Sequence, residues 1–80
     1  MAEGDLQRAV GANLRRYREE HGLSQEAFAD VLGFHRTYVG GLERGERNLS
    51  LQSVERLAAA IGLSPLDLLV TEPESLRAQN

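Results

Sequence analysis

The chain has 80 residues, an apolar fraction of 41%, no cysteine and a formal net charge of −3. This length suffices for one compact domain and is too short for two. The absence of cysteine excludes disulfides and thiolate metal sites, and no stretch approaches the roughly twenty apolar residues of a membrane span. The first residues carry acids without an apolar run, so we expect no secretion signal and a cytoplasmic protein.

The net acidic charge is unusual for a nucleic-acid-binding protein, but the charges are unevenly distributed. Acidic residues outnumber basic ones near the C-terminus, which contains Asp67, Glu72 and Glu74 but only one arginine, Arg77. All nine basic residues are arginine, a side chain that can grip a guanine or a phosphate through two parallel hydrogen bonds. The arginines that precede residue 48 are therefore consistent with DNA binding, despite the net negative charge.

Apolar residues recur at helical spacing and strand-like alternation is absent, so we expect an all-α fold. The first helix should span residues 5–20, and Gly22 then breaks the chain. Ser24 is a suitable N-cap for a short second helix over 25–32, and Gly33 can adopt the left-handed conformation that ends it. The residues of these two helices that we expect to face the core are Leu6, Val10, Leu14, Tyr17, Phe28, Val31 and Leu32.

A third helix is expected to begin after His35 and to run to Arg44, followed by a loop over 46–49. Ser50 caps a fourth helix over 51–61. The core residues expected in these two helices are Val39, Leu42, Leu51, Val54, Leu57, Ala58 and Ile61.

Ser64 and Pro65 open a short fifth helix, because they combine an N-cap with proline at the first helical position. From Thr71 onward the composition is polar. We therefore predict one domain over residues 1–70, a five-helix bundle, and a polar C-terminal tail over 71–80.

The second and third helices, joined by a turn that contains glycine, have the outline of a helix-turn-helix. Ala29 stands where the two helices cross closely, and a larger side chain would push them apart. Gly33 lies at the turn, and Val39 and Leu42 anchor the third helix. Similar helical hairpins occur in proteins that do not bind DNA, but these four positions together favour a DNA-binding unit.

Three strings in this region resemble the Xre/Cro family of phage-repressor-type DNA-binding domains. They are LRRYREEHGLSQEAFADVLG, RTYVGGLERGERNLSLQSVERLAAAIGLS and PLDLL. The string RTYVGGLERGERNLS is also similar to restriction–modification controller proteins, small stand-alone members of that family. The resemblance implies a bacterial or phage transcription regulator that binds double-stranded DNA at specific sequences.

On matching positions, the third helix resembles the recognition helix that enters the major groove, and Arg36, Thr37 and Tyr38 are the implied base readers. Arg36 can donate to O6 and N7 of one guanine, which discriminates between bases by roughly 1–3 kcal/mol. Tyr38 suits either a DNA contact or the core. Gly41 stands where the family often has a polar base-contacting side chain, so specificity would depend chiefly on Arg36 and Thr37.

The resemblance also implies contacts to the DNA backbone. Ser24 and Gln25 head the second helix, where the family grips a phosphate with a side-chain amide and the positive helix end. His35 either caps the third helix or contacts a phosphate. Arg18 and Glu43 match a buried ion pair of the family, for which a structural role is expected. The remaining backbone candidates are Arg44, Arg47 and Asn48.

Repressor-type domains pair to read two half-sites about 34–36 Å apart, so a homodimer on a pseudo-palindromic operator is expected. The candidate interface consists of Leu63, Leu66, Leu69 and Val70, although the same side chains can instead complete the monomer core.

No metal-site spacing accompanies the two histidines, and neither a catalytic triad nor a glycine-rich phosphate loop is present. We therefore expect no metal, cofactor, small-molecule ligand or enzymatic activity. The main alternative to a regulator is a protein-interaction module, such as an antitoxin that binds a toxin through its C-terminal tail.

Overall fold

The computed structural model describes residues 2–71, and within that range the chain forms five α-helices and no strand. This confirms the all-α fold class. All five helices begin, and the first four end, within one residue of the expected position. The predicted tail over 71–80 lies outside the described residues except for Thr71. In chain order the helices are α1 (Asp5–Glu20), α2 (Gln25–Leu32), α3 (Arg36–Glu43), α4 (Leu51–Ala60) and α5 (Pro65–Leu69).

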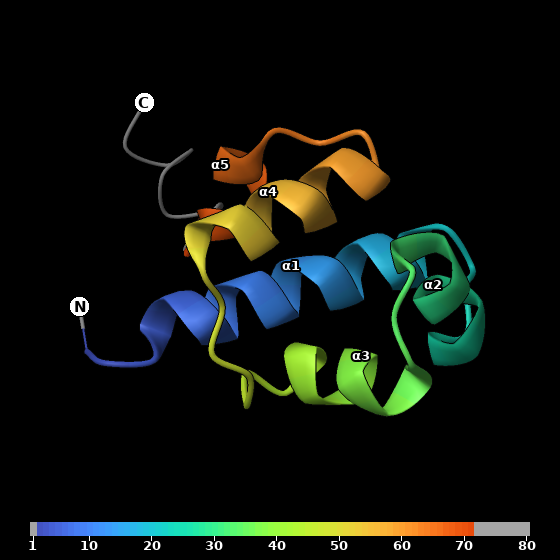
Figure 1. Ribbon diagram of the computed structural model, residues 1–80, viewed down its shortest axis with the longest axis horizontal. Coiled ribbons are helices and arrows are strands. Elements are labelled where there is room, and N and C mark those ends of the chain that lie inside the picture. Colours follow the sequence, from blue (N-terminus) through green and yellow to red (C-terminus); the bar gives the residue numbers. More distant parts are fainter. Residues whose placement is uncertain (1, 72–80) are drawn as a thin grey trace.

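Helix α1 is the central element of the bundle (Figure 1). It packs against α3 on one side and against α5 on the other, while α4 packs on α5 and α2 packs on α3 and α4. Within the described range no helix is long and apolar enough to cross a membrane.

One hydrophobic core joins all five helices. Burying a large aliphatic or aromatic side chain contributes about 1.5–3 kcal/mol, so side chains that are fully enclosed are the main source of stability in a domain this small. The largest of them are Phe28, Leu14, Leu42, Leu57, Leu68, Val10 and Val39.

Three apolar residues expected in the core are instead exposed: Leu6 by 45%, Val31 by 47% and Leu51 by 79%. Leu51 is the first residue of α4 and Leu6 lies in the first turn of α1, so both stand at the start of a helix. Val31 lies on the side of α2 that faces away from its neighbours. Periodicity identifies an apolar stripe, but it does not show how much of that stripe the rest of a small domain covers.

Helices α1 and α3 approach each other at backbone distance. A Cβ atom built on Gly11 would lie 2.1 Å from the carbonyl oxygen of Leu42. No side chain fits into that space, so glycine at this position fixes how closely α3 packs on α1.

Candidate nucleic-acid interface

Helices α2 and α3 are joined by a tight turn. The Ser24 hydroxyl caps α2 by accepting a hydrogen bond from the Ala27 N–H at 3.0 Å. Gly33 ends α2 with a φ of 78°, in the left-handed region that favours glycine. The N–H groups of Gly33 and Phe34 both donate to the Ala29 carbonyl, at 2.8 and 3.0 Å. These contacts hold the two helices in the helix-turn-helix arrangement that the sequence predicts.

The first two residues of α3 present their side chains to solvent. His35 caps the helix through Nδ1, which accepts a hydrogen bond from the Thr37 N–H at 3.1 Å. The sequence left two roles open for His35, capping α3 or contacting a phosphate, and the structure shows the capping role. Arg36 and Thr37 are both exposed, so two of the three predicted base readers lie on open surface at the start of α3.

Tyr38 has different surroundings from the other two predicted readers. It is half-buried and packs against the core. Its ring centroid lies 4.9 Å from that of Phe34, and the guanidinium carbon of Arg47 lies 5.0 Å from the Tyr38 centroid. The structure therefore places Tyr38 between the core and Arg47, at the edge of the exposed surface.

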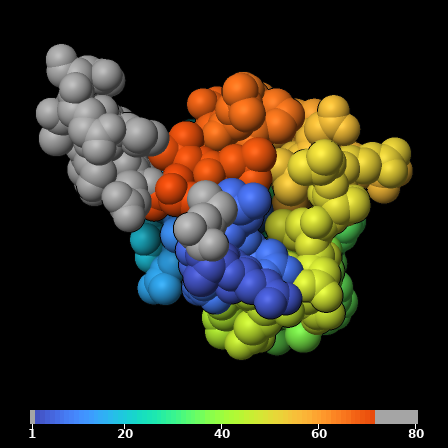
Figure 2. Space-filling model, turned by 90° about the vertical axis from the view of Figure 1, so that its left-hand side faces the viewer, coloured from blue at the N-terminus to red at the C-terminus, as the bar shows by residue number. Residues whose placement is uncertain are grey.

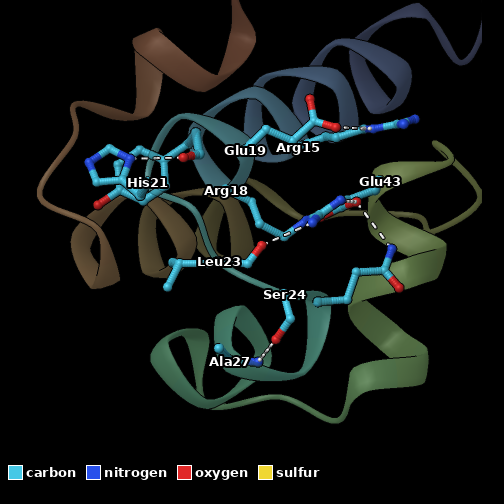
Figure 3. A network of polar contacts seen from close by, with 10 residues as sticks. Arg15, Arg18, Glu19, His21, Leu23, Ser24, Ala27 and Glu43 are labelled. Atoms are coloured by element: carbon cyan, nitrogen blue, oxygen red, sulfur yellow. Dashed lines mark hydrogen bonds and ion pairs between the residues drawn. The ribbon is translucent and has the colours of Figure 1, made fainter.

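The last residue of α3 is anchored to α1 by an ion pair, which Figure 3 shows from close by. Arg18 Nε donates to Glu43 Oε2 at 2.7 Å, and Arg18 Nη2 donates to Oε1 at 3.1 Å. The two side chains are only 15% and 4% exposed. Arg18 Nη1 also donates to the Leu23 carbonyl at 3.1 Å. The hydrogen bonds that Arg18 donates to Glu43 raise the pKa of Arg18, so its guanidinium is charged at any physiological pH.

Gln25 and Asn48, two further residues predicted to contact the DNA backbone, also have hydrogen-bond partners inside the protein. Gln25 Nε2 donates to Glu43 Oε1 at 3.2 Å, which ties the start of α2 to the end of α3. An amide nitrogen carries two hydrogens, so this bond leaves one for a phosphate. Asn48 Oδ1 accepts a hydrogen bond from Gln7 Nε2 and so connects the loop after α3 to the first turns of α1.

Arg44 and Arg47, the two arginines predicted to hold phosphates, are exposed beside α3. Arg44 Nε lies 3.1 Å from Glu46 Oε1, and these two side chains are 60% and 59% exposed. Arg47 lies against Tyr38 as described above. The exposed guanidinium groups of Arg36, Arg44 and Arg47 thus all lie on α3 or on the loop that follows it.

The predicted dimer residues divide into two groups. Leu66 is 72% exposed, whereas Leu63, Leu69 and Val70 are half-buried. Leu63 and Leu69 pack against the core. The residue of α5 that is completely buried is Leu68, which the sequence analysis did not single out. Of the four predicted residues, only Leu66 lies mainly on open surface.

Asn13, a polar residue of α1 that is only 7% exposed, was not predicted from the sequence to have a role. Its Nδ2 donates to the carbonyls of Leu68 and Val70, at 2.8 and 3.0 Å, and its Oδ1 accepts from Arg16 Nη2 at 2.6 Å. Asn13 therefore satisfies one carbonyl in the last turn of α5 and one of the residue that follows the helix, and it docks α5 on α1. The signal in the sequence was a lone polar residue beside Leu14 in the apolar stripe.

Over residues 2–71 no group of three or more histidine, cysteine or acidic side chains is arranged to hold a metal ion. His21 Nδ1 lies 2.8 Å from the Tyr17 carbonyl at the end of α1, and the two rings stack with their centroids 3.9 Å apart. His35 caps α3. Both histidines thus stand at helix ends.

Comparison with known proteins agrees with this geometry. The helix-turn-helix family profile matches residues 14–68. Control protein C.SmaI of Serratia marcescens is 41% identical over 68 residues, which cover 85% of this chain and 81% of that protein. A crystal structure of the hypothetical transcription factor NHTF from Neisseria superposes with a TM-score of 0.79 at 37% identity, covering 98% of this chain and 90% of the other. The restriction-modification controller protein C.AhdI from Aeromonas hydrophila gives a TM-score of 0.67 at 45% identity, with coverage of 78% and 94%.

The chain therefore belongs to the Xre-type helix-turn-helix family, and the resemblance inferred from the sequence is confirmed. It is a DNA-binding transcription regulator whose relatives include restriction-modification controller proteins.

Proposed function

We propose that this protein is a controller-type regulator that binds a two-fold symmetric operator as a homodimer, with one α3 helix in the major groove at each half-site. The observation that carries the proposal is the orientation of α3. Its first turn presents Arg36 and Thr37 to solvent, while its last residue, Glu43, is held by a buried ion pair. A helix anchored at one end and exposed at the other can be inserted without disturbing the core.

The dimensions of α3 suit this role. Eight residues rise by about 12 Å, which is close to the width of the major groove. Arg36 begins the helix, and Gln25 lies beside the other end through its bond to Glu43. A base reader and a phosphate contact therefore stand at opposite ends of α3. In this proposal Arg36 reads a guanine, Thr37 contacts a neighbouring base, and Tyr38 supports them from the edge of the core.

Phosphate contacts are assigned to the groups around this helix. Ser24 and Gln25 head α2, where the first N–H groups of a helix have no partner within it and attract anions. Arg44 and Arg47 contribute exposed positive charge from the loop after α3. His35 and Asn48 are assigned mainly a structural role, because His35 caps α3 and Asn48 holds the loop after α3 to the start of α1.

The dimer is proposed to form through an apolar end face composed of Leu6, Leu49, Leu51, Leu66 and Leu69. Figure 2 looks onto this end of the molecule, where the start of α1 (blue), the start of α4 (yellow) and α5 (orange-red) meet. Leu66 and Leu51 are 72% and 79% exposed. Leu6, Leu49, Leu51 and Leu69 lie around a small hollow, and apolar side chains grouped at the surface in this way are typical of an association surface. The hollow has a volume of about 80 Å³ and is lined by Leu6, Gln7, Val10, Leu49, Leu51, Val54 and Leu69.

This end face modifies the interface expected from the sequence. Leu66 and Leu69 remain in it, and because they are three positions apart they lie on one side of α5. Leu63 and Val70 line a different groove, together with Asn13 and Tyr17 of α1. We therefore assign them to the monomer, and we add Leu6, Leu49 and Leu51 to the interface.

We further propose that the protein acts in the cytoplasm by binding rather than by catalysis, since its relatives are transcription regulators, and that residues 1–70 form the DNA-binding domain. The test is selection of bound duplexes from a randomised library at moderate salt, combined with sedimentation of the protein alone. A symmetric consensus with half-sites about 34–36 Å apart, and a dimer in sedimentation, support the proposal. A folded protein that enriches no duplex contradicts it and favours a role in protein–protein interaction.

A further inference from the structure

Helix α3 carries two consecutive glycines that are buried although neither has a side chain. The atoms over them belong to arginines. A Cβ built on Gly41 would lie 2.9 Å from Nε of Arg47 and 3.3 Å from its Cγ. A Cβ built on Gly40 would lie 3.1 Å from Nη1 of Arg44. The middle of the Arg47 side chain thus lies on Gly41, whereas Arg44 touches Gly40 only with its tip.

The loop after α3 turns the chain back toward the helix. Gly45 has a φ of 72°, and the Glu46 N–H donates to the Gly41 carbonyl at 2.9 Å. The next residue, Arg47, then lies with its guanidinium carbon 5.0 Å from the centre of the Tyr38 ring. A cation at that distance is attracted by the face of the ring. Because Tyr38 and Gly41 are three residues apart in a helix, they share one face, and together they form an arginine seat for Arg47.

The arginine seat adjoins the surface to which base reading was assigned, because Gly41 follows Thr37 by one helical turn. Glycine lowers the stability of a helix interior relative to alanine, so two glycines are unfavourable in a helix of eight residues. The absence of a Cβ at Gly41 has a compensating effect, because the Arg47 side chain occupies the space that a side chain of position 41 would fill.

We propose that Gly41 and Tyr38 are positioning residues for Arg47. They hold its guanidinium on the DNA-facing side of α3, where it takes the place of the side chain that position 41 lacks. This inference rests on the proposed function, which assigns that side of α3 to DNA. An arginine already held against a ring and a helix loses less conformational freedom on binding than one that extends into solvent.

The seat is tested first in the free protein, by the NMR resonance of the Arg47 Nε–Hε group. Held near the face of Tyr38, this proton is shifted upfield by the ring current. The shift should disappear in Tyr38→Leu and in Gly41→Ala, and it should persist in Gly40→Ala, where the added Cβ meets only the flexible tip of Arg44. An unshifted resonance in the wild-type protein overturns the seat, whatever the protein does with DNA.

The second test measures affinity for the duplex enriched by the wild-type protein. Arg47→Ala should weaken binding by about tenfold, the effect of one lost charge-assisted hydrogen bond. Gly41→Ala should weaken it similarly without lowering thermal stability, because alanine favours the helix. Adding Arg47→Ala to the Gly41→Ala variant should then change the affinity little, whereas adding it to the Gly40→Ala variant should lower the affinity by the full tenfold. Equal losses in both glycine backgrounds overturn the positioning role. Failure of the wild-type protein to enrich any duplex contradicts the proposed function, and the NMR result remains decisive for the seat.

Discussion

Arg18 of α1 and Glu43 at the end of α3 form an ion pair with two direct hydrogen bonds, in which the carboxylate is only 4% exposed. Gln25 donates to the same carboxylate, so three helices meet at Glu43. The position of α3 relative to the rest of the domain, and with it the direction in which Arg36 points, depends on this junction.

Replacing only one member of this ion pair should lower the stability of the protein strongly. Glu43→Leu leaves the Arg18 guanidinium largely buried without its partner, which destabilises a protein by about 3–5 kcal/mol. Replacing both residues, as in Arg18→Met with Glu43→Leu, should cost much less than the sum of the two single changes, because no buried charge remains unpaired. Urea denaturation of the four proteins measures this coupling. Additive losses would mean that the two side chains act independently.

Asn13 is expected to control the docking of α5. Asn13→Leu keeps the volume but removes both donors from the carbonyls of Leu68 and Val70, and a buried unsatisfied group costs about 1–3 kcal/mol. The loss should appear in urea denaturation and as faster amide exchange in α5 than in α3. Gln52→Leu, on the exposed side of α4, is the matched control and should change stability by less than about 0.5 kcal/mol. Equal effects of the two variants would exclude the docking role.

Arg36 is expected to determine sequence preference without contributing to the fold, since its side chain is exposed at the start of α3. Arg36→Ala should reduce discrimination at one base pair of each half-site by about 1–3 kcal/mol. Library selection with the variant measures this as a relaxed position in the consensus. Arg56→Ala, an exposed arginine of α4, should leave the consensus unchanged. An unaltered preference in Arg36→Ala would remove that residue from base reading.

The sequence predicted the helices well because their boundaries are encoded locally. Ser24, Ser50 and Ser64 each cap a helix as expected, and Gly33 adopts the left-handed conformation that ends α2. These signals act within a few residues of the chain, so they can be read without knowledge of the tertiary structure.

The candidate site was harder to predict, because the partner of a side chain is set by packing between distant segments. Nothing near Asn48 in the chain indicates that Gln7 donates to it, and the contact of Arg47 with Tyr38 depends on the turn at Gly45. The same holds for Leu51, whose spacing fits the core although its place at a helix end leaves it exposed. The sequence pattern identifies candidate residues, whereas the tertiary contacts determine which partners these residues have and how exposed they are.

Dimerisation through the apolar end face should be abolished by Leu66→Glu. The side chain is 72% exposed in the monomer, so the substitution leaves the core intact while placing a charge in the interface. Sedimentation equilibrium should show a monomer, and binding to the symmetric operator should weaken more than binding to a single half-site. Val31→Glu, which alters an exposed apolar residue of α2, is the control and should remain dimeric. A dimer that survives Leu66→Glu would place the interface elsewhere.

Glu46 is expected to oppose DNA binding, because its carboxylate pairs with Arg44 beside α3. Both side chains are exposed, so the pair contributes little to stability. Glu46→Gln removes a negative charge that repels phosphate and releases Arg44. Affinity should therefore rise for all sequences alike, and the plot of log affinity against log salt should steepen by about one unit, as for one additional phosphate contact. Titrations at several salt concentrations measure both effects, with Glu55→Gln on α4 as the control for net charge. If affinity for DNA rises equally in the two variants, the increase reflects the total charge of the protein, and Arg44 makes no phosphate contact of its own.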